Sequence, residues 1–283
     1  MGRCVFHQAQ QLRLPRVGNA RNDTLGQFLD VVSRHARSEI HRHDIVLRHA
    51  QSFGNRTHQF HDRGIVVVDL TAAARQLAEA IGRSVVYEYG GVMLLRPGVA
   101  GFDADGRKDG PVVNLSYWVF EAFPVLATLA PEYDWNGVWR EGIVLLQQAT
   151  AGKSHLPADW LSIRNRMMPR TAEGFDPEFG YNSLRIPLYL LRAGMADMDW
   201  LKTLRQRWIV DQEGVATVNV VTGEIKERLT DQGYVALSAL LACALDGTKV
   251  PDALKAFNPQ FYYPASLYLL SMSLIGEKYP QCL

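Results

Sequence analysis

Four polar residues stand immediately before the most apolar helix that the sequence predicts. They are Tyr181, Asn182, Ser183 and Arg185, which supply a phenol, an amide, a hydroxyl and a guanidinium. Such groups donate and accept hydrogen bonds in many directions, so together they suit a ligand rich in hydroxyl groups. An ordinary helix start, with Asn182 or Ser183 as its N-cap, would give the same pattern. The spacing alone leaves both interpretations open.

The helix that must position this cluster runs from Ile186 to Leu191. It is apolar on nearly every side, which is typical of a helix buried all round. Pro187 lacks an amide proton and disfavours helical geometry at Ile186, so a regular helix extends little further upstream. The polar residues are therefore expected at the mouth of the helix.

Most of the remaining elements are expected to be helices. Val85 to Leu95 is rich in β-branched and aromatic residues around Gly90-Gly91, which predicts a hairpin before a loop from Arg96 to Pro111. Two short strands are expected within residues 215–228. Apolar spacing and capping residues predict helices over residues 71–81, 115–130, 134–150, 198–211, 230–245 and 263–276. Helices with short connections predict an all-α fold of paired helices.

Composition excludes several classes of function. The 283 residues are 47% apolar, enough for one large core, and a net charge of +1 gives no general attraction to nucleic acid or acidic membranes. No stretch approaches the ~18 apolar residues of a membrane span, and no export signal is visible, so a soluble, unsecreted chain is expected. Cys4, Cys243 and Cys282 lack metal spacing and imply no disulfide framework, and Cys243 is expected in the core.

The first part of the chain differs in composition from the rest. Seven of the eight histidines precede residue 64, whereas no lysine appears before Lys108 and no tryptophan before Trp118. Histidine pairs such as His41 and His43 would suit zinc or copper, but no acidic or cysteine ligands recur beside them. A basic arm for nucleic acid is a further alternative, although stacking aromatics are few. We expect residues 1–70 to be an atypical segment outside the fold of residues 71–283, for example the product of a shifted reading frame.

Two stretches of the sequence resemble one enzyme family. Tyr181 to Arg185 is similar to the Tyr-Asp-Ala-x-Arg helix of glycoside hydrolase family eight, a family of bacterial endo-1,4-β-glucanases. Leu94 to Phe102 and Pro111 to Phe123 resemble that family's Leu-Leu-Pro-Gly and Asn-Pro-Ser-Tyr region. The blocks follow in the family's order, and the resemblance, closest to rhizobial-type cellulases, runs from about Thr71 to Tyr279.

The resemblance implies a ring of twelve helices, the (α/α)6 toroid. Residues 71–283 would supply its C-terminal two-thirds, so the toroid would be incomplete, with a small β-hairpin element. Residues 1–70 carry no clear series of caps and apolar stripes to supply the remaining helices.

The resemblance also implies hydrolysis of β-1,4-glucan with inversion, which needs one carboxyl as acid and another as base. The family's acid lies in a Ser-Glu-Gly-x-x-Tyr-Gly motif that this chain lacks, and Glu39 and Asp44 stand in different surroundings. At the position of the base stands Asn182, whose neutral amide cannot take a proton from water. Asp176 and Glu178, just upstream, are candidate substitutes, with ordinary solvated loop residues as the alternative.

The resemblance to the family also implies which residues of this chain contact the substrate. Tyr117, Trp118 and Tyr181 are expected to stack on sugar rings, and Asn114 and Ser116 to line the cleft beside them. Arg185 is expected to position Asn182 or a cleft carboxylate by forked hydrogen bonds. Tyr262-Tyr263 is expected to brace the cleft.

The leading hypothesis is therefore an endo-1,4-β-glucanase that acts on a β-1,4-glucan as a monomer, without metal or organic cofactor. One alternative is an inactive, truncated or frame-shifted relative that keeps part of the glucan cleft and only binds. An all-α interaction scaffold unrelated to sugars is a third. Relatives are typically periplasmic or extracellular, and the sequence leaves the location and the exact polysaccharide open.

Overall fold

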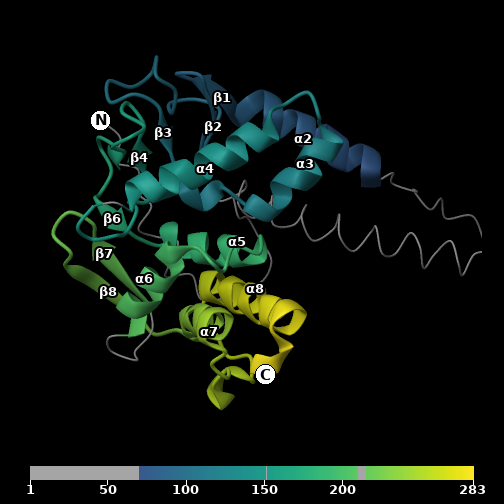
Figure 1. The fold of residues 1–283 in the computed structure, drawn as a ribbon, viewed down its shortest axis with the longest axis vertical. Coiled ribbons are helices and arrows are strands. Elements are labelled where there is room, and N and C mark those ends of the chain that lie inside the picture. Colours follow the sequence, from purple (N-terminus) through teal and green to yellow (C-terminus); the bar gives the residue numbers. More distant parts are fainter. Residues whose placement is uncertain (1–69, 151, 210–214) are drawn as a thin grey trace, which may run out of the picture.

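The computed structural model of the protein describes residues 70–150, 152–209 and 215–283 (Figure 1). Residues 1–69, with the histidine pairs, Glu39 and Asp44, lie outside these ranges, and so do the expectations made for them. Seven α-helices and three small antiparallel sheets occur in the described ranges. The prediction of a mainly helical fold is confirmed.

The first group of helices carries the expected hairpin. Helix α2 spans Leu70–Val85, and β1 (Val86–Tyr89) pairs with β2 (Val92–Leu95) through Gly90 and Gly91. Both glycines have positive φ, the conformation that a two-residue hairpin turn requires. Helix α4 (Trp135–Ala149) follows the N-cap residue Asp134, whose carboxylate accepts a hydrogen bond from the Gly137 N–H.

The expected helix over residues 115–130 is wrong in its first half. Short 3₁₀ helices occupy Leu115–Tyr117 and Phe120–Ala122, and helix α3 covers only Phe123–Leu129. Trp118 and Val119 between them have ψ of 85° and 81°, which is far from helical. Pro124 then stands in the first turn of α3, where its missing amide proton costs nothing. The Trp118 side chain is completely buried, and this burial explains the break in the helix.

The second group surrounds the central helix. Helix α5 (Ile186–Arg192) lies between the α2–α4 group and helices α6 (Asp199–Ile209), α7 (Gln232–Asp246) and α8 (Tyr262–Lys278) (Figure 1). All seven residues of α5 are buried, as its apolar sequence predicts. Its last residue, Arg192, forms a buried ion pair with Glu121 of the preceding 3₁₀ helix. This pair ties α5 to the first group.

The structure contains two three-stranded sheets, of which the sequence predicts only two strands. In one, β3 (Val112–Val113), β4 (Leu161–Ser162) and β5 (Arg170–Thr171) pair antiparallel. In the other, the expected strands β7 (Val215–Asn219) and β8 (Ile225–Leu229) are joined by β6 (Glu178–Phe179), directly upstream of Tyr181. This second sheet fixes the approach of the chain to the polar cluster.

The core is one continuous set of buried side chains that includes Trp118, Trp135, Tyr189, Phe123 and Phe179. Cys243 is buried there, as expected. It is also joined to Cys282 by a disulfide with a Cα–Cα distance of 6.0 Å, which corrects the expectation that the cysteines form no such bond. The pairing joins positions 39 residues apart, which no local spacing could indicate.

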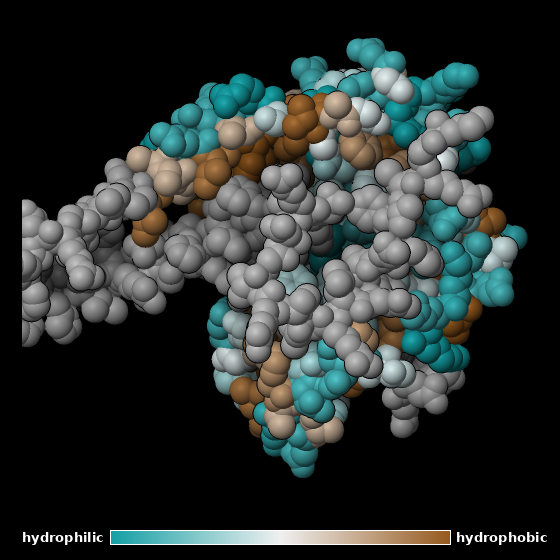
Figure 2. Space-filling model, turned by 180° about the vertical axis from the view of Figure 1, so that it is seen from behind, coloured by the Kyte–Doolittle hydropathy of each residue, from teal (hydrophilic) through white to brown (hydrophobic). Residues whose placement is uncertain are grey.

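Seen from behind, the outer surface is mostly polar, and apolar side chains gather along the lower edge of the upper helix group (Figure 2). Leu70 and Leu77 of α2 are among the exposed large apolar residues. In the part of the chain that the structure describes, no helix is long and apolar enough to cross a membrane.

Candidate active site

The polar cluster lies at the start of α5, as the sequence predicts. Ser183–Arg185 form a single 3₁₀ turn that leads into α5. Arg185 is buried, and its Nη2 donates to Asn182 Oδ1 over 3.1 Å and to Ser116 Oγ over 2.9 Å. The expected contact between Arg185 and Asn182 is therefore present, made through one nitrogen that also holds Ser116.

Arg185 brings the two family-like stretches together. Ser116 Oγ donates to Asn114 Oδ1 over 2.7 Å, and the Ser116 N–H donates to the same oxygen over 3.1 Å. The Arg185 guanidinium also lies over the Tyr117 ring, 5.5 Å from its centroid. Asn114 and Ser116 are completely buried, so they hold Arg185 in place. Tyr117 and Asn182 are half-buried and present part of their surface to solvent.

Asp159 is the site residue that the sequence analysis missed. Its Oδ1 accepts from the N–H groups of Gly180 and Ser183, both over 2.9 Å, and its Oδ2 accepts from the Asn182 side chain over 3.2 Å. Burial raises the pKa of the Asp159 carboxyl, while the hydrogen bonds from Ser183, Gly180 and Asn182 oppose that rise. A lone Asp between the apolar residues Ala158 and Trp160 is the signal that could have indicated it.

The glycine at position 180 follows from this packing. A Cβ at Gly180 would lie 2.7 Å from Asp159 Oδ2 and 3.2 Å from Cγ of Glu178. Only a residue without a side chain allows the Asp159 carboxylate to approach the backbone so closely. Asp159 therefore fixes the backbone from Gly180 to Ser183 and, through it, the orientation of Asn182.

Three tyrosines and a glutamate flank the cluster. The ring centroids of Tyr181, Tyr234 and Tyr263 lie 6.2–6.4 Å apart. The Tyr181 hydroxyl donates to Glu227 on β8, and the Tyr263 hydroxyl donates to the Tyr181 carbonyl oxygen. Burial, first of all, raises the pKa of Tyr234, and the nearby tyrosines add to the rise. Tyr263 thus contacts the backbone of Tyr181, whereas its neighbour Tyr262 is exposed.

Trp118 does not present a face for a sugar ring. Its side chain is completely buried, and the indole N–H donates to the Val138 carbonyl oxygen of α4 over 3.0 Å. A Cβ at Gly142 of α4 would lie 2.3 Å from the indole, so the ring packs directly on the helix backbone. This burial requires the non-helical backbone at Trp118 and corrects its prediction as a stacking residue.

A stack of aromatic rings lies beside Asp159. Trp160 is stacked between Phe102 and Phe175, with centroid distances of 5.7 and 4.6 Å, and meets the Tyr117 ring edge-on at 6.4 Å. The stack joins the loop after β2 to the loops around β4 and β5. It therefore connects the surroundings of Tyr117 with those of Asp159.

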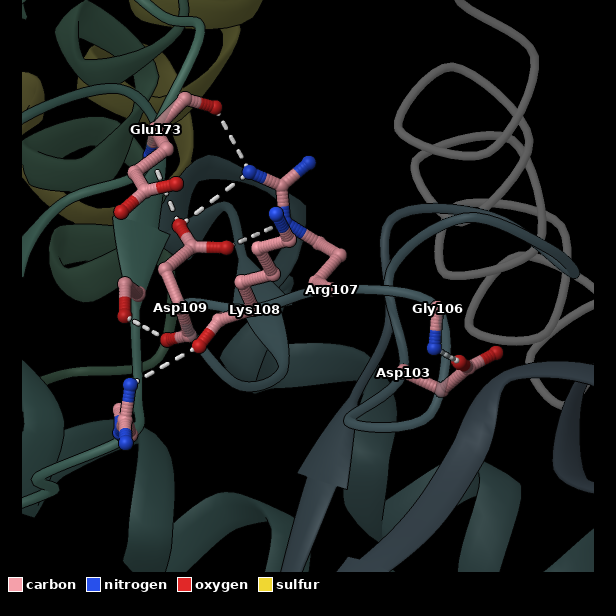
Figure 3. A network of polar contacts seen from close by, with 8 residues as sticks. Asp103, Gly106, Arg107, Lys108, Asp109 and Glu173 are labelled. Carbon is pink, nitrogen blue, oxygen red and sulfur yellow. Dashed lines mark hydrogen bonds and ion pairs between the residues drawn. The ribbon is translucent and has the colours of Figure 1, made fainter.

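An ion pair clamps the same loops together (Figure 3). Asp109 accepts from Arg107 Nε over 2.9 Å and from the Glu173 N–H over 2.7 Å, while Arg107 donates to the Glu173 carbonyl over 2.6 Å. Burial would raise the pKa of Asp109, but Arg107 and the Glu173 N–H outweigh it, so the pKa is lowered. Asp109 is thus held ionised between the two loops.

The family model "Glycosyl hydrolases family 8" matches residues 69–277, which is most of the chain. The chain belongs to this family. Among curated relatives, an endoglucanase of Cellulomonas uda is 32% identical over 120 residues, 42% of this chain and 32% of that protein. A probable endoglucanase of Novacetimonas hansenii is 32% identical over 186 residues, 64% of this chain and 52% of that protein. The chain thus spans about a third of the length of the first relative and about half of the length of the second.

Solved family 8 structures share the fold. An endo-β-1,4-glucanase from Acetobacter xylinum superposes with a TM-score of 0.63 at 26% identity, covering 74% of this chain and 64% of that chain. A family 8 endoglucanase from Klebsiella pneumoniae gives a TM-score of 0.60 at 26% identity, covering 73% and 64%. The described helices therefore belong to an (α/α)6 toroid, with small sheets at its edge.

The other predicted carboxylates of this family 8 chain have different partners. The Glu178 carboxylate accepts from Lys226 Nζ over 2.8 Å, and Asp176 lies 3.9 Å from the same nitrogen. The hydrogen bond from Lys226 to Glu178 raises the pKa of Lys226. Asp176 and Glu178 are therefore held in ion pairs with Lys226, beside the Tyr181–Arg185 turn. The family's general acid was expected upstream of residue 71, outside the described ranges.

Proposed function

We propose that this chain is a glycoside hydrolase that cleaves β-1,4-linked glucans internally and with inversion. The observation that carries the proposal is the contact of Arg185 with Asn182, Ser116 and Tyr117 at the mouth of the buried helix α5. Both motif blocks shared with family 8 meet at this one guanidinium. Relatives of similar sequence are named endoglucanases, which supports the choice of substrate.

The half-buried side chains at this point suit a neutral sugar chain. Tyr117 and Tyr181 offer ring surface to the apolar faces of pyranose rings, and Asn182 offers an amide to hydroxyl groups. Arg185 is held by Ser116 and Asn182 beneath them, so its charge orients neighbours and is screened from the ligand. All these residues come from one chain, and we expect a monomer to suffice.

The proposed reaction needs two carboxyl groups and neither a metal nor an organic cofactor. In an inverting enzyme the acid and the base stand ~6.5–9.5 Å apart, which leaves room for the attacking water. Asn182 stands where the family has its base, and an amide has no proton affinity at neutral pH. A carboxylate elsewhere in the chain must therefore take the proton.

A second candidate function is glucan binding without hydrolysis. The specific observation in its favour is that Asn182 is neutral and its neighbour Asp159 accepts N–H donors on both carboxylate oxygens. A cleft with these residues alone would hold a glucan and leave it uncut.

One experiment separates the two functions. The full chain is incubated with carboxymethyl-cellulose, new reducing ends are counted, and the affinity for cellohexaose is measured by calorimetry. The proposal predicts reducing ends together with binding, and Arg185→Lys reduces both, whereas the matched change Arg83→Lys, at an exposed arginine of α2, reduces neither. Binding without reducing ends would favour the second function, and the absence of both would contradict a glucan site.

A further inference from the structure

We propose that the Glu227 carboxylate is the proton acceptor that replaces the missing base at Asn182. This inference rests on the proposed hydrolysis of glucans and names the residue that makes it possible. Glu227 lies on β8, 45 positions after Asn182, and neither motif of the sequence analysis includes it.

Glu227 is joined directly to the cluster. The Tyr181 hydroxyl, one residue before Asn182, donates to Glu227 Oε2. Its second oxygen, Oε1, has no hydrogen-bond partner among the described residues, and the side chain is exposed. A general base must reach the water that it activates and must have a free lone pair for the proton. Glu227 meets both requirements.

The sheet holds Glu227 in this place. Strand β8 pairs with β7 so that Glu227 stands opposite Thr217, and β7 pairs with β6 so that Val218 stands opposite Phe179. Phe179 precedes Gly180 and Tyr181 in the chain. The same three strands therefore position both partners of the hydrogen bond between Tyr181 and Glu227, and the Tyr263 hydroxyl donates to the Tyr181 carbonyl oxygen.

Asp159 is the rival that the structure argues against. It accepts a hydrogen bond from the Asn182 side chain, but the Asp159 side chain is buried, and both of its oxygens already accept N–H groups of the Gly180–Ser183 backbone or of Asn182. Taking up a proton would break these hydrogen bonds in the interior, which is costly. Asp159 is a positioning residue.

Asp176 and Glu178 are the rivals from the sequence. Both lie near Lys226, and Glu178 accepts a hydrogen bond from it over 2.8 Å. Their side chains make contact with Lys226, whereas Glu227 makes contact with Tyr181. The polar contacts therefore connect Glu227, and not these two residues, to the aromatic rings expected to hold the sugar.

The proposed step conserves atoms and charge. The water oxygen bonds to the anomeric carbon as the bond from that carbon to the leaving oxygen breaks. One proton of the water passes to Glu227 Oε1, and the leaving oxygen takes its proton from a carboxylic acid on the opposite side of the sugar ring. The product carries the inverted configuration at the anomeric carbon.

The test compares Glu227→Gln and Glu227→Ala with the matched change Glu224→Gln, at an exposed glutamate of the same hairpin. With cellohexaose as substrate, Glu227→Gln is expected to lower kcat by about 10²–10⁴-fold with little change in KM. Glu224→Gln keeps the wild-type kcat. Because Glu227 is exposed, thermal unfolding of all variants should match the wild type.

Added sodium azide gives a readout that a structural role would not change. In Glu227→Ala the azide anion fits the space of the lost carboxylate and attacks the anomeric carbon without needing a base. Cleavage is then restored, and the product is a glycosyl azide. Wild-type kcat in Glu227→Gln, or no azide product from Glu227→Ala, overturns the inference while glucan hydrolysis stands. No cleavage by the wild-type chain overturns the proposed function and this inference together.

Discussion

The Asn182 side chain donates a hydrogen bond to the Asp159 carboxylate over 3.2 Å. Asp159 also binds the backbone on either side of Asn182. The neutral amide of Asn182 therefore suits this position, because it donates a hydrogen bond to the buried Asp159 carboxylate. A second carboxylate at position 182 would repel Asp159.

Asn182→Asp should not simply restore a family-like base. Two carboxylates within hydrogen-bonding distance cannot both ionise freely, so one pKa in the folded state rises above its unfolded value. We expect the free energy of unfolding to fall by about 1–3 kcal/mol at pH 7, with Arg185 limiting the loss. Because the raised pKa favours the protonated folded form, the loss should shrink as the pH falls towards 4. Urea unfolding at pH 4 to 8 measures this.

Asn136→Asp is the matched control, because Asn136 is exposed in the first turn of α4. A negative charge there is favourable, so no loss of stability is expected. Equal effects of the two changes at pH 7 would contradict the arrangement of Asn182 and Asp159.

Asp109→Asn should remove the loop clamp and its pH dependence. The pKa of Asp109 is lowered in the fold, so its contribution is present above the ordinary value of 3.8 and is lost as the pH falls through the folded pKa. We expect a loss of about 1–3 kcal/mol at pH 7 relative to the wild type, because Arg107 and the Glu173 N–H lose their carboxylate. At a pH below the folded pKa of Asp109, the stabilities of the two proteins should converge. Asp105→Asn, in the exposed part of the same loop, should match the wild type throughout.

Trp118→Phe should affect stability and leave glucan binding unchanged. The change removes the hydrogen bond to Val138 and part of a buried side chain, so a loss of about 1–3 kcal/mol is expected. Tyr117→Ala, at the half-buried neighbour, should instead weaken the affinity for cellohexaose. Denaturant unfolding and calorimetry on both variants provide the comparison. A weaker affinity in Trp118→Phe with unchanged stability would return Trp118 to the ligand site.

Gly233→Ala tests the contact between α7 and α8. A Cβ at Gly233 would lie 1.8 Å from the Pro264 carbonyl oxygen, so the helices would have to move apart. We expect a loss of about 3 kcal/mol or more. Gly276→Ala on α8 meets no atom within 4 Å and should stabilise the protein by about 0.5–1 kcal/mol through helix propensity. Similar unfolding midpoints for the two variants would show that α7 and α8 pack differently.

Local patterns in the sequence predicted the elements that depend on local causes. Helix α5 follows from a run of apolar residues around a proline, and the β1–β2 hairpin follows from Gly90-Gly91. The family motifs correctly paired Arg185 with Asn182.

Features that depend on distant partners could not be predicted in the same way. Strands β3 and β4 are two residues each and pair across about fifty positions of sequence, too short for a periodic pattern to appear. The residues around Trp118 have the apolar spacing of a helix. The burial of the Trp118 side chain against Gly142 overrides this helical preference. Asp159 and Glu227 are distant from Asn182 in the sequence, and only folding brings them close to the Tyr181–Arg185 turn. In the same way, only folding brings Cys243 and Cys282 together to form their disulfide.

The most direct measurement is the configuration of the sugar that the wild-type chain first releases from cellohexaose, followed by proton nuclear magnetic resonance. If the Tyr181–Arg185 turn belongs to an inverting glucan hydrolase, the α-anomer should appear first and change to the equilibrium mixture by mutarotation. Release of the β-anomer first, or a spectrum in which cellohexaose stays intact, would contradict this account.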